Sequence, residues 1–299
     1  MEGESIVEGG SRTQADPIRG LALDGLNNET WGMDSSRPPA PADHPALCTP
    51  GNALGIASPF RWLAKGAADL AARPWPSLFY GVCFAAMGWL LGWALRTSPG
   101  LMMALTAGFL LVGPFMAIGL YEVARCRQAG EACDLFVSTT AWGRNFTNLA
   151  IMGVALGVIL ALWARSSMLL IAVSFTWEVP STLALVQGIL AGEHLEFAIA
   201  WLAVGGLFAG LVFSFTVIAI PMMLDRGTDA ISAMLASVSA TLRYFPMMMV
   251  WAALIVSLIV AGFASFFVGL IVTGPIVGLA SWHAYCEISA AAENTTIAN

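Results

Sequence analysis

The sequence predicts an all-α polytopic membrane protein with six transmembrane helices, arranged as three pseudo-repeated hairpins that each follow a cytoplasmic amphipathic helix. Three observations support this fold class. Of the 299 residues, 58% are hydrophobic and 11% are charged, whereas a soluble domain has about 25% charged residues. Apolar runs of membrane length begin at Pro76, and one pattern of residues recurs three times. A water-exposed globular domain is therefore excluded.

Residues 1–56 precede the first span and differ in composition from the rest of the chain. They contain six prolines, three arginines and eight acidic residues, and no apolar run longer than three residues. Such a segment buries too little surface to offset the entropy lost on ordering, so we expect a disordered, acidic, proline-rich tail. The tail lacks the basic stretch and apolar core of a signal peptide. It either recruits a partner or remains a solvated extension.

Six spans are expected, since about 20 helical residues cross about 30 Å of hydrocarbon. They lie near residues 76–95, 100–121, 148–164, 197–221, 246–262 and 266–284. Residues 166–180 are also apolar at first, but this run is shorter and ends in Glu178 and Pro180. We expect a loop with short interfacial helices there rather than a seventh crossing. The membrane domain then covers 57–290, and 291–299 form a short C-terminal tail.

Basic residues near the span ends predict the orientation of the chain. One side carries eight of them: Arg61, Lys65, Arg73, Arg125, Arg127, Arg144, Arg226 and Arg243. The other side carries only Arg96 and Arg165. The positive-inside rule therefore places both termini in the cytoplasm. Since cytoplasmic thiols stay reduced and the five cysteines show no Cys-x-x-Cys spacing, we expect no disulfide framework.

One unit repeats three times, over residues of about 58–128, 129–226 and 228–288. Each unit has a surface helix, then an arginine followed closely by an aromatic residue, then two spans. The three arginines are Arg73, Arg144 and Arg243. The second span of each unit contains a proline, and these are Pro114, Pro221 and Pro275. Proline removes a helical hydrogen bond that lipid cannot replace, so we expect the three bends to face the interior of the bundle.

The surface helices have amphipathic spacing and are expected to lie in the cytoplasmic interface. The apolar face of the first consists of Phe60, Leu63, Ala64, Ala67, Leu70 and Ala71. That of the third consists of Ile231, Met234, Leu235, Val238 and Leu242, after a cap at Thr228 or Asp229. The second helix, with Leu135, Thr139, Trp142 and Phe146, has a weaker pattern.

Four motifs, in their order along the chain, resemble a known family. They are Phe60-Arg61-Trp62-Leu63-Ala64-Lys65-Gly66, Gly113-Pro114-Phe115 through Gly119-Leu120-Tyr121-Glu122, Pro221-Met222-Met223-Leu224-Asp225-Arg226, and Ser281-Trp282-His283-Ala284-Tyr285. Over roughly residues 57–290 the chain resembles the bacterial integral membrane proteins catalogued as domain of unknown function 2189. The resemblance implies a multipass protein of the bacterial cytoplasmic (inner) membrane, and it supplies no catalytic residues.

Members of this family are often labelled cytochrome c oxidase subunit I, and the sequence contradicts that label. A haem–copper oxidase needs several histidines inside its spans to hold two haems and copper. This chain has His44 in the tail, His194 in an outer loop and His283 at a span end. Such separated histidines cannot build that site, so we expect no oxidase activity.

Glu122, Asp229 and His283 form the candidate site, because each follows the proline of its repeat by eight residues. If the repeats share an axis along the membrane normal, the three side chains converge at the cytoplasmic mouth. A carboxylate–histidine group there could bind a metal or relay a proton, with Cys286 as a further ligand. In the alternative interpretation, Asp229 caps the third surface helix, Glu122 and His283 lie in headgroup water, and Cys286 is a small buried thiol.

The function expected from these patterns is that of a non-enzymatic membrane scaffold or accessory protein. Its partners would be the lipid bilayer and either another membrane protein or a second copy of the chain. We find no common catalytic motif and no basic patch for nucleic acid, and we expect no catalytic residue, bound metal or cofactor. The predicted spans also lack the ionisable residues that ion-coupled carriers place at midplane depth. The alternative is a transporter or channel for a small neutral or amphiphilic solute.

Overall fold

The computed structural model describes Cys48 and residues 54–97, 99–175 and 182–297. Close contacts divide the chain into a unit Met1–Ala46 and a unit Leu47–Asn299, and all described residues belong to the second. Most of the predicted disordered tail therefore lies outside the described residues. Every regular element within them is helical, which confirms the all-α class.

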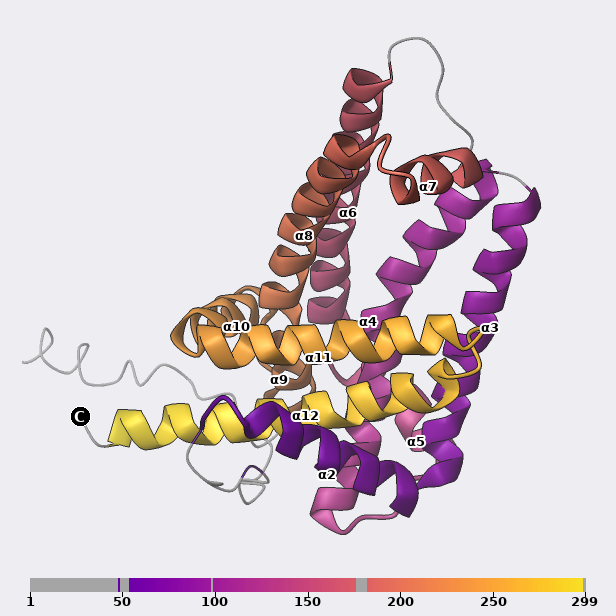
Figure 1. Cartoon of the computed structure of the whole chain (residues 1–299). Helices are drawn as coiled ribbons and strands as arrows, with labels where there is room; N and C mark the ends of the chain where they lie inside the picture. Colours follow the sequence, from indigo (N-terminus) through magenta and orange to yellow (C-terminus); the bar gives the residue numbers. More distant parts are fainter. Residues whose placement is uncertain (1–47, 49–53, 98, 176–181, 298–299) are drawn as a thin grey trace, which may run out of the picture. The chain divides into compact units, whose positions relative to one another are not determined.

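Helices succeed one another with short connections along the described chain, as expected for a polytopic protein (Figure 1). They are α2 Ser58–Ala72, α3 Pro74–Thr97, α4 Pro99–Ala129, α5 Leu135–Thr140, the short 3₁₀ helix η1 Ala141–Asn145, α6 Phe146–Ser174, α7 Thr182–Leu190, α8 Leu195–Thr216, α9 Ala219–Arg226, α10 Ala230–Arg243, α11 Phe245–Ala264 and α12 Leu270–Ile297. Helix α12 thus continues through most of the segment predicted as a C-terminal tail.

Helix α12 lies at the centre of the packed core. Its residues Trp282, Ala284 and Tyr285 are fully buried, and the helix lies beside α2, α3, α4 and α11. Next to it, Trp62 of α2 and Trp251 of α11 meet edge to face, with their ring centroids 5.6 Å apart. Large buried aromatic side chains contribute much of the apolar area removed from water. The first and last repeats therefore share one core.

The approach of α2 to α12 requires a glycine at position 66. A Cβ atom on Gly66 would lie 2.7 Å from the backbone nitrogen of Ala280 and 2.8 Å from the carbonyl oxygen of Ile276. Backbone atoms cannot yield at such distances without moving a helix. Trp62 and Asp69, about one turn before and after Gly66, are buried on the same side of α2.

Each surface helix exposes some of its large apolar side chains. Phe60 of α2 is 57% exposed, Phe136 of α5 is 77% exposed and Leu235 of α10 is 64% exposed. The side of α10 that packs inward consists of Ala230, Ala233, Ser237 and Thr241. A helix that packs by small and polar residues and leaves its apolar stripe outside is suited to lying in a lipid interface.

Four stretches of the described residues are long and apolar enough to cross a membrane. They are Pro74–Ala94, Leu135–Ser174, Leu195–Arg226 and Phe245–Ala264. The second predicted span lies in α4, where several side chains are outside the described part. The sixth lies in α12, where the polar residues from Ser281 onward lower the mean hydropathy. The chain is a helical membrane protein with several apolar helices, while the six-span arrangement stays a prediction.

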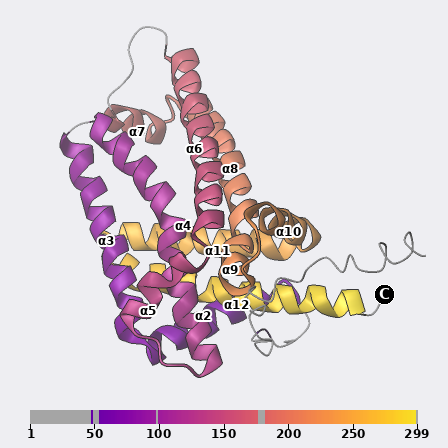
Figure 2. The same ribbon diagram turned by 180° about the vertical axis from the view of Figure 1, so that it is seen from behind.

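The third predicted hairpin is oriented differently from the other two. Helices α11 and α12 run side by side, and they lie crosswise to α3, α4, α6 and α8 when seen from the front and from behind (Figures 1 and 2). Three equivalent hairpins would place all six long helices alike. The predicted threefold repeat of hairpins is therefore not reproduced within this unit.

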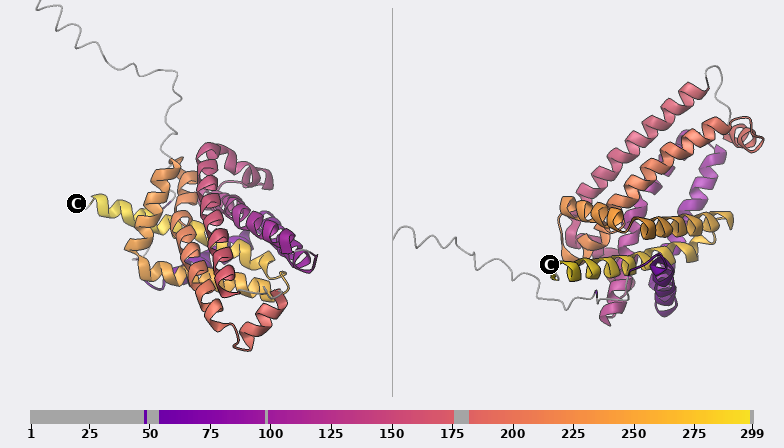
Figure 3. Two further views of the ribbon diagram at one scale, coloured as in Figure 1. Left: turned by 90° about the horizontal axis from the view of Figure 1, so that it is seen from above. Right: turned by 60° about the vertical axis from the view of Figure 1, so that its left-hand side comes forward.

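Helix α6 runs on to Ser174, so the loop predicted for 166–180 is wrong over 166–174. The segment Ser166–Val173 contains neither glycine nor proline, and nothing in it ends the helix. Phe175 then packs on α8, with ring centroids 5.2 Å from Phe197 and 5.3 Å from His194. Helices α6 and α8 lie side by side in both views of Figure 3. Residues 176–181 lie outside the described part of the chain.

Candidate functional site

The three predicted site residues lie in different surroundings, and no described contact joins them. Glu122 is buried near the end of α4, Asp229 is exposed before α10, and His283 is half-buried on α12. Within the described ranges, no group of three or more histidine, cysteine, aspartate or glutamate side chains is placed to hold a metal ion. The convergence predicted from their equal spacing after proline is absent from the structure.

Glu122 is held by two arginines. Arg125, one turn along α4, donates from Nε and from one terminal nitrogen to the two carboxylate oxygens, each at 2.9 Å. Arg144 of η1 also binds the carboxylate. Burial by itself raises the pKa of Glu122, but the hydrogen bonds and charges of Arg125 and Arg144 outweigh it and leave the pKa below its ordinary value. The carboxylate therefore stays ionised and ties α4 to the start of α6.

Asp229 caps a helix, as the alternative interpretation of the sequence stated. Its carboxylate accepts a hydrogen bond of 2.9 Å from the backbone N–H of Ser232, in the first turn of α10. Aspartate is among the preferred residues at this position because its oxygen satisfies one of the unpaired N–H groups of the first turn.

His283 of α12 pairs with Asp69 of α2. The Nε2 atom of His283 lies 2.8 Å from Asp69 Oδ2, and Arg127 of α4 binds the other carboxylate oxygen. Asp69 is buried, with 3% of its surface exposed. A cavity of about 280 Å³ opens beside this trio. Partners from three helices thus meet at one buried carboxylate.

A second buried carboxylate, Glu287, joins α12 to the start of α2. Its oxygens accept hydrogen bonds from Lys65 Nζ at 2.6 Å, from the indole N–H of Trp62 at 2.9 Å and from Arg61 at 3.3 Å. Burial raises the pKa of Glu287, but the hydrogen bonds from Lys65 and Trp62 and the nearby positive charges outweigh it, so the pKa lies below its ordinary value. The spacing of residues along the chain gave no indication that Glu287 contacts α2.

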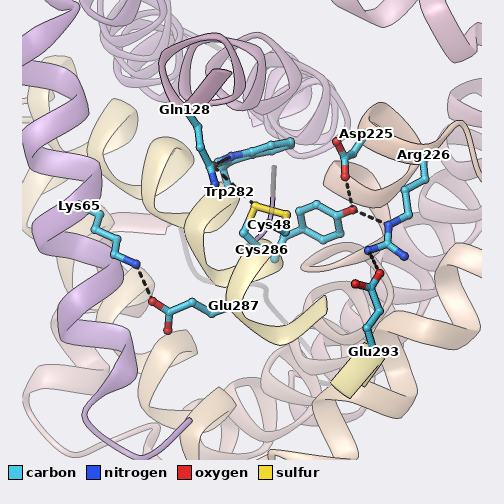
Figure 4. Close-up of a disulfide and its surroundings, with 10 residues drawn as sticks. Cys48, Lys65, Gln128, Asp225, Arg226, Trp282, Cys286, Glu287 and Glu293 are labelled. Carbon is cyan, nitrogen blue, oxygen red and sulfur yellow. Dashed lines mark hydrogen bonds and ion pairs between the residues drawn. A yellow bond between two sulfur atoms is a disulfide. The ribbon is translucent and has the colours of Figure 1, made fainter. Parts of the chain in front are cut away.

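Tyr285 and Trp282 of α12 make further polar contacts in the core. The Tyr285 hydroxyl donates to Asp225 at 2.7 Å and accepts from Arg226 at 3.1 Å, and Arg226 pairs with Glu293 at 2.6 Å. The indole N–H of Trp282 donates to the side-chain oxygen of Gln128 at 2.9 Å. Figure 4 shows Trp282, Gln128, Asp225, Arg226 and Glu293 in the surroundings of Cys286.

In this structure Cys286 forms a disulfide with Cys48, which differs from the predicted absence of a disulfide framework (Figure 4). The two residues are separated by 238 positions in the sequence, and their Cα atoms lie 4.6 Å apart. Cys286 is accordingly no candidate metal ligand. Cys126 and Cys133 remain free and buried.

The residues that marked the repeat have unequal roles. Arg73 donates to the backbone oxygen of Glu131 at 2.9 Å, Arg144 binds Glu122, and Arg243 lies over the ring of Tyr244 with 5.7 Å to the centroid. The three prolines are not on the exposed surface: Pro114 is half-buried within α4, and Pro221 and Pro275 are buried. Pro221 stands in the first turn of α9, after α8 has ended.

The long apolar helices, joined by the ion pairs described above, define the chain as a polytopic helical membrane protein. Residues 101–225 match the family described as "Predicted integral membrane protein (DUF2189)", which supports the family assignment that the motifs indicated. No curated protein matches the chain. No solved structure matches it either.

Proposed function

We propose that this protein is a non-enzymatic scaffold or accessory protein of the bacterial cytoplasmic membrane, with six spans and both termini in the cytoplasm. It works through contacts with lipid and with another membrane protein or a second copy of itself. The observation that carries the proposal is the pairing of its buried charges. Each of the three buried carboxylates of the described residues, Asp69, Glu122 and Glu287, is bound by an arginine or lysine from another helix.

Charges engaged in this way hold helices together rather than act on a substrate. A catalytic acid or base needs a pKa suited to proton transfer and access to the reacting atom. Glu122 and Glu287 instead have lowered pKa values and several donors each. The outward apolar faces of α2, α5 and α10 support the second half of the proposal, because they offer surface to lipid or to a partner.

The proposed orientation is supported by the distribution of basic residues. Arg61, Lys65, Arg125, Arg127 and Arg144 all take part in the ion pairs described above. They therefore gather around one set of helix ends, as a single cytoplasmic side requires.

A transporter needs a continuous path, and two cavities among the described residues are separate from each other. The cavity of about 280 Å³ is lined by residues of α2, α4 and α12. A second, of about 480 Å³, is apolar and is lined by residues of α3 and of the segment leading into α5. The two share no residue, which favours the scaffold over the transporter.

Native gel electrophoresis of membranes solubilised in a mild detergent tests the proposal. We expect the full-length protein to migrate in a complex larger than one copy with its detergent, and we expect proteoliposomes to show no protein-dependent flux of small neutral solutes. A single copy that carries such a flux would overturn the scaffold and support the transporter.

A further inference from the structure

The cavity beside Asp69 has the composition of an anion site. Its polar lining consists of Lys65, Asp69, Arg127, Gln128 and His283, and two alanines complete it. It therefore brings together side chains from α2, α4 and α12 that are far apart in the sequence. At about 280 Å³, it has room for a phosphate group and part of the molecule that carries it.

The ionised side chains at the cavity keep one net positive charge, because Lys65 and Arg61 share Glu287 while Arg127 is bound to Asp69. Lys65 and Arg127 contribute two positive charges, and Asp69 contributes one negative charge. Glu287, which pairs with Lys65, is not among the lining residues. Lys65 and Arg127 keep 48% and 36% of their side-chain surface exposed, so both can reach a ligand that enters from outside. Asp69 is buried and fixes the Arg127 guanidinium and the His283 ring in place.

We propose that this cavity binds a phosphate ester, of the kind carried by phospholipid headgroups and by soluble glycerol phosphates. Lys65 and Arg127 contact the phosphate oxygens through charge-assisted hydrogen bonds, for which a guanidinium and an ammonium are the usual partners. Asp69 acts as a positioning residue, because its carboxylate oxygens are engaged by Arg127 and His283.

The surroundings favour a lipid as the source of the phosphate. The apolar face of α2 is turned outward beside the cavity, where Ala64 and Ala67 are exposed, and an acyl chain can lie along such a face. The proposed orientation also brings the cavity to the cytoplasmic level of the headgroups. To this extent the inference rests on the proposed function, since it names one lipid contact of the scaffold.

Binding to the purified full-length protein in neutral detergent tests the site. The probes are short-chain phosphatidylglycerol, glycerol phosphate, inorganic phosphate, and a short-chain diacylglycerol that lacks phosphate. Lys65→Gln should weaken binding of the phosphate esters about tenfold, as expected for the loss of one charge-assisted hydrogen bond. Arg61→Gln is the matched control, because Arg61 also pairs with Glu287 but does not line the cavity. It should change the affinity by less than about twofold.

A second variant keeps the test independent of the ion pairs. Ala68→Leu fills the cavity and leaves every charge in place, and it should also weaken binding about tenfold if the ligand occupies this space. Thermal unfolding of each variant shows whether it remains folded.

The outcomes separate the sources of the phosphate. Tighter binding of phosphatidylglycerol than of glycerol phosphate supports the site with a lipid as its ligand, and equal binding supports it with a soluble ester. The proposal is overturned if no phosphate ester binds, if diacylglycerol binds equally well, or if Lys65→Gln and Arg61→Gln lose the same affinity. If the site fails while the native-gel complex persists, the proposed function stands without it.

Discussion

Asp69 of α2 and His283 of α12 are hydrogen-bonded across 214 positions of sequence, with 2.8 Å between Oδ2 and Nε2. Arg127 of α4 binds the same carboxylate. This one buried group therefore ties the first long described helix to the last, and it ties both to α4.

Replacing Asp69 should destabilise the fold. In Asp69→Asn the carboxylate charge is lost, and Arg127, which is 36% exposed, loses its ion-pair partner, which costs about 1–2 kcal/mol. Thermal unfolding in detergent should show a clearly lowered midpoint. Asp229→Asn is the matched control, since asparagine also caps helices and this side chain is exposed. Equal midpoints for the two variants would contradict the role given to Asp69.

Replacing Gly66 by alanine and replacing Gly210 by alanine should shift the unfolding midpoint in opposite directions. Gly66→Ala forces a Cβ atom into the backbone of α12 and should separate the two helices, which lowers the unfolding midpoint. Gly210, within α8, has nothing within 4 Å of a Cβ atom. At such an open helical position alanine gains about 1 kcal/mol from helix propensity. A neutral or stabilising Gly66→Ala would show that α2 does not pack on α12 at this distance.

The stability of the protein should depend on Glu287 in acid. A carboxyl group whose pKa is lowered on folding stabilises the native state above its unfolded pKa of about 4.3, and this contribution disappears as the pH falls through the folded pKa. Below about pH 4.3 the wild-type midpoint should therefore fall more steeply than that of Glu287→Gln. Glu193→Gln, which changes an exposed carboxylate, should keep the wild-type slope. Identical slopes for all three proteins would refute the pairing of Glu287.

The disulfide and the proposed orientation together predict the redox state of Cys48 and Cys286 in cells. Cys286 lies at the end assigned to the cytoplasm, where thiols are kept reduced. We expect Cys48 and Cys286 to be reduced in growing cells, and to form the bond after the membranes are isolated in air. Acid trapping of thiols followed by peptide mapping measures this, with Cys83 as a free-thiol reference. A bond already present in trapped cells would place this end in an oxidising compartment and reverse the orientation.

Local sequence signals predicted the helices well. The long apolar runs indicated α3, α8 and α11 with starts within a few residues, since span length follows from bilayer thickness. Amphipathic spacing indicated the apolar faces of α2 and α10, and of these faces the structure exposes Phe60, Ile231, Leu235 and Leu242 while Leu63, Leu70 and Met234 pack partly on the core. The end of α6 was missed because Arg165 resembled a span boundary, although a helix without glycine or proline can continue past one charged side chain.

The contacts of the site depend on packing between distant helices, and the sequence could not indicate them. Asp69 of α2 pairs with His283 where α2 and α12 approach closely at Gly66, and Cys48 pairs with Cys286 across 238 positions of sequence. Equal spacing after the prolines suggested a cluster of Glu122, Asp229 and His283. The different orientation of the third hairpin removes the symmetry on which that cluster depended.

The packing of α2 on α12 also has a consequence for the order of events during synthesis. About 200 residues separate the end of α2 from the start of α12, and translation at about 5–20 residues per second takes about 10–40 s to produce them. Throughout that interval Gly66 lacks the helix on which it packs, and Asp69 lacks its partner His283. The nascent α2 must therefore wait at the bilayer surface on its apolar stripe, and the last helix to leave the ribosome completes the fold of the first.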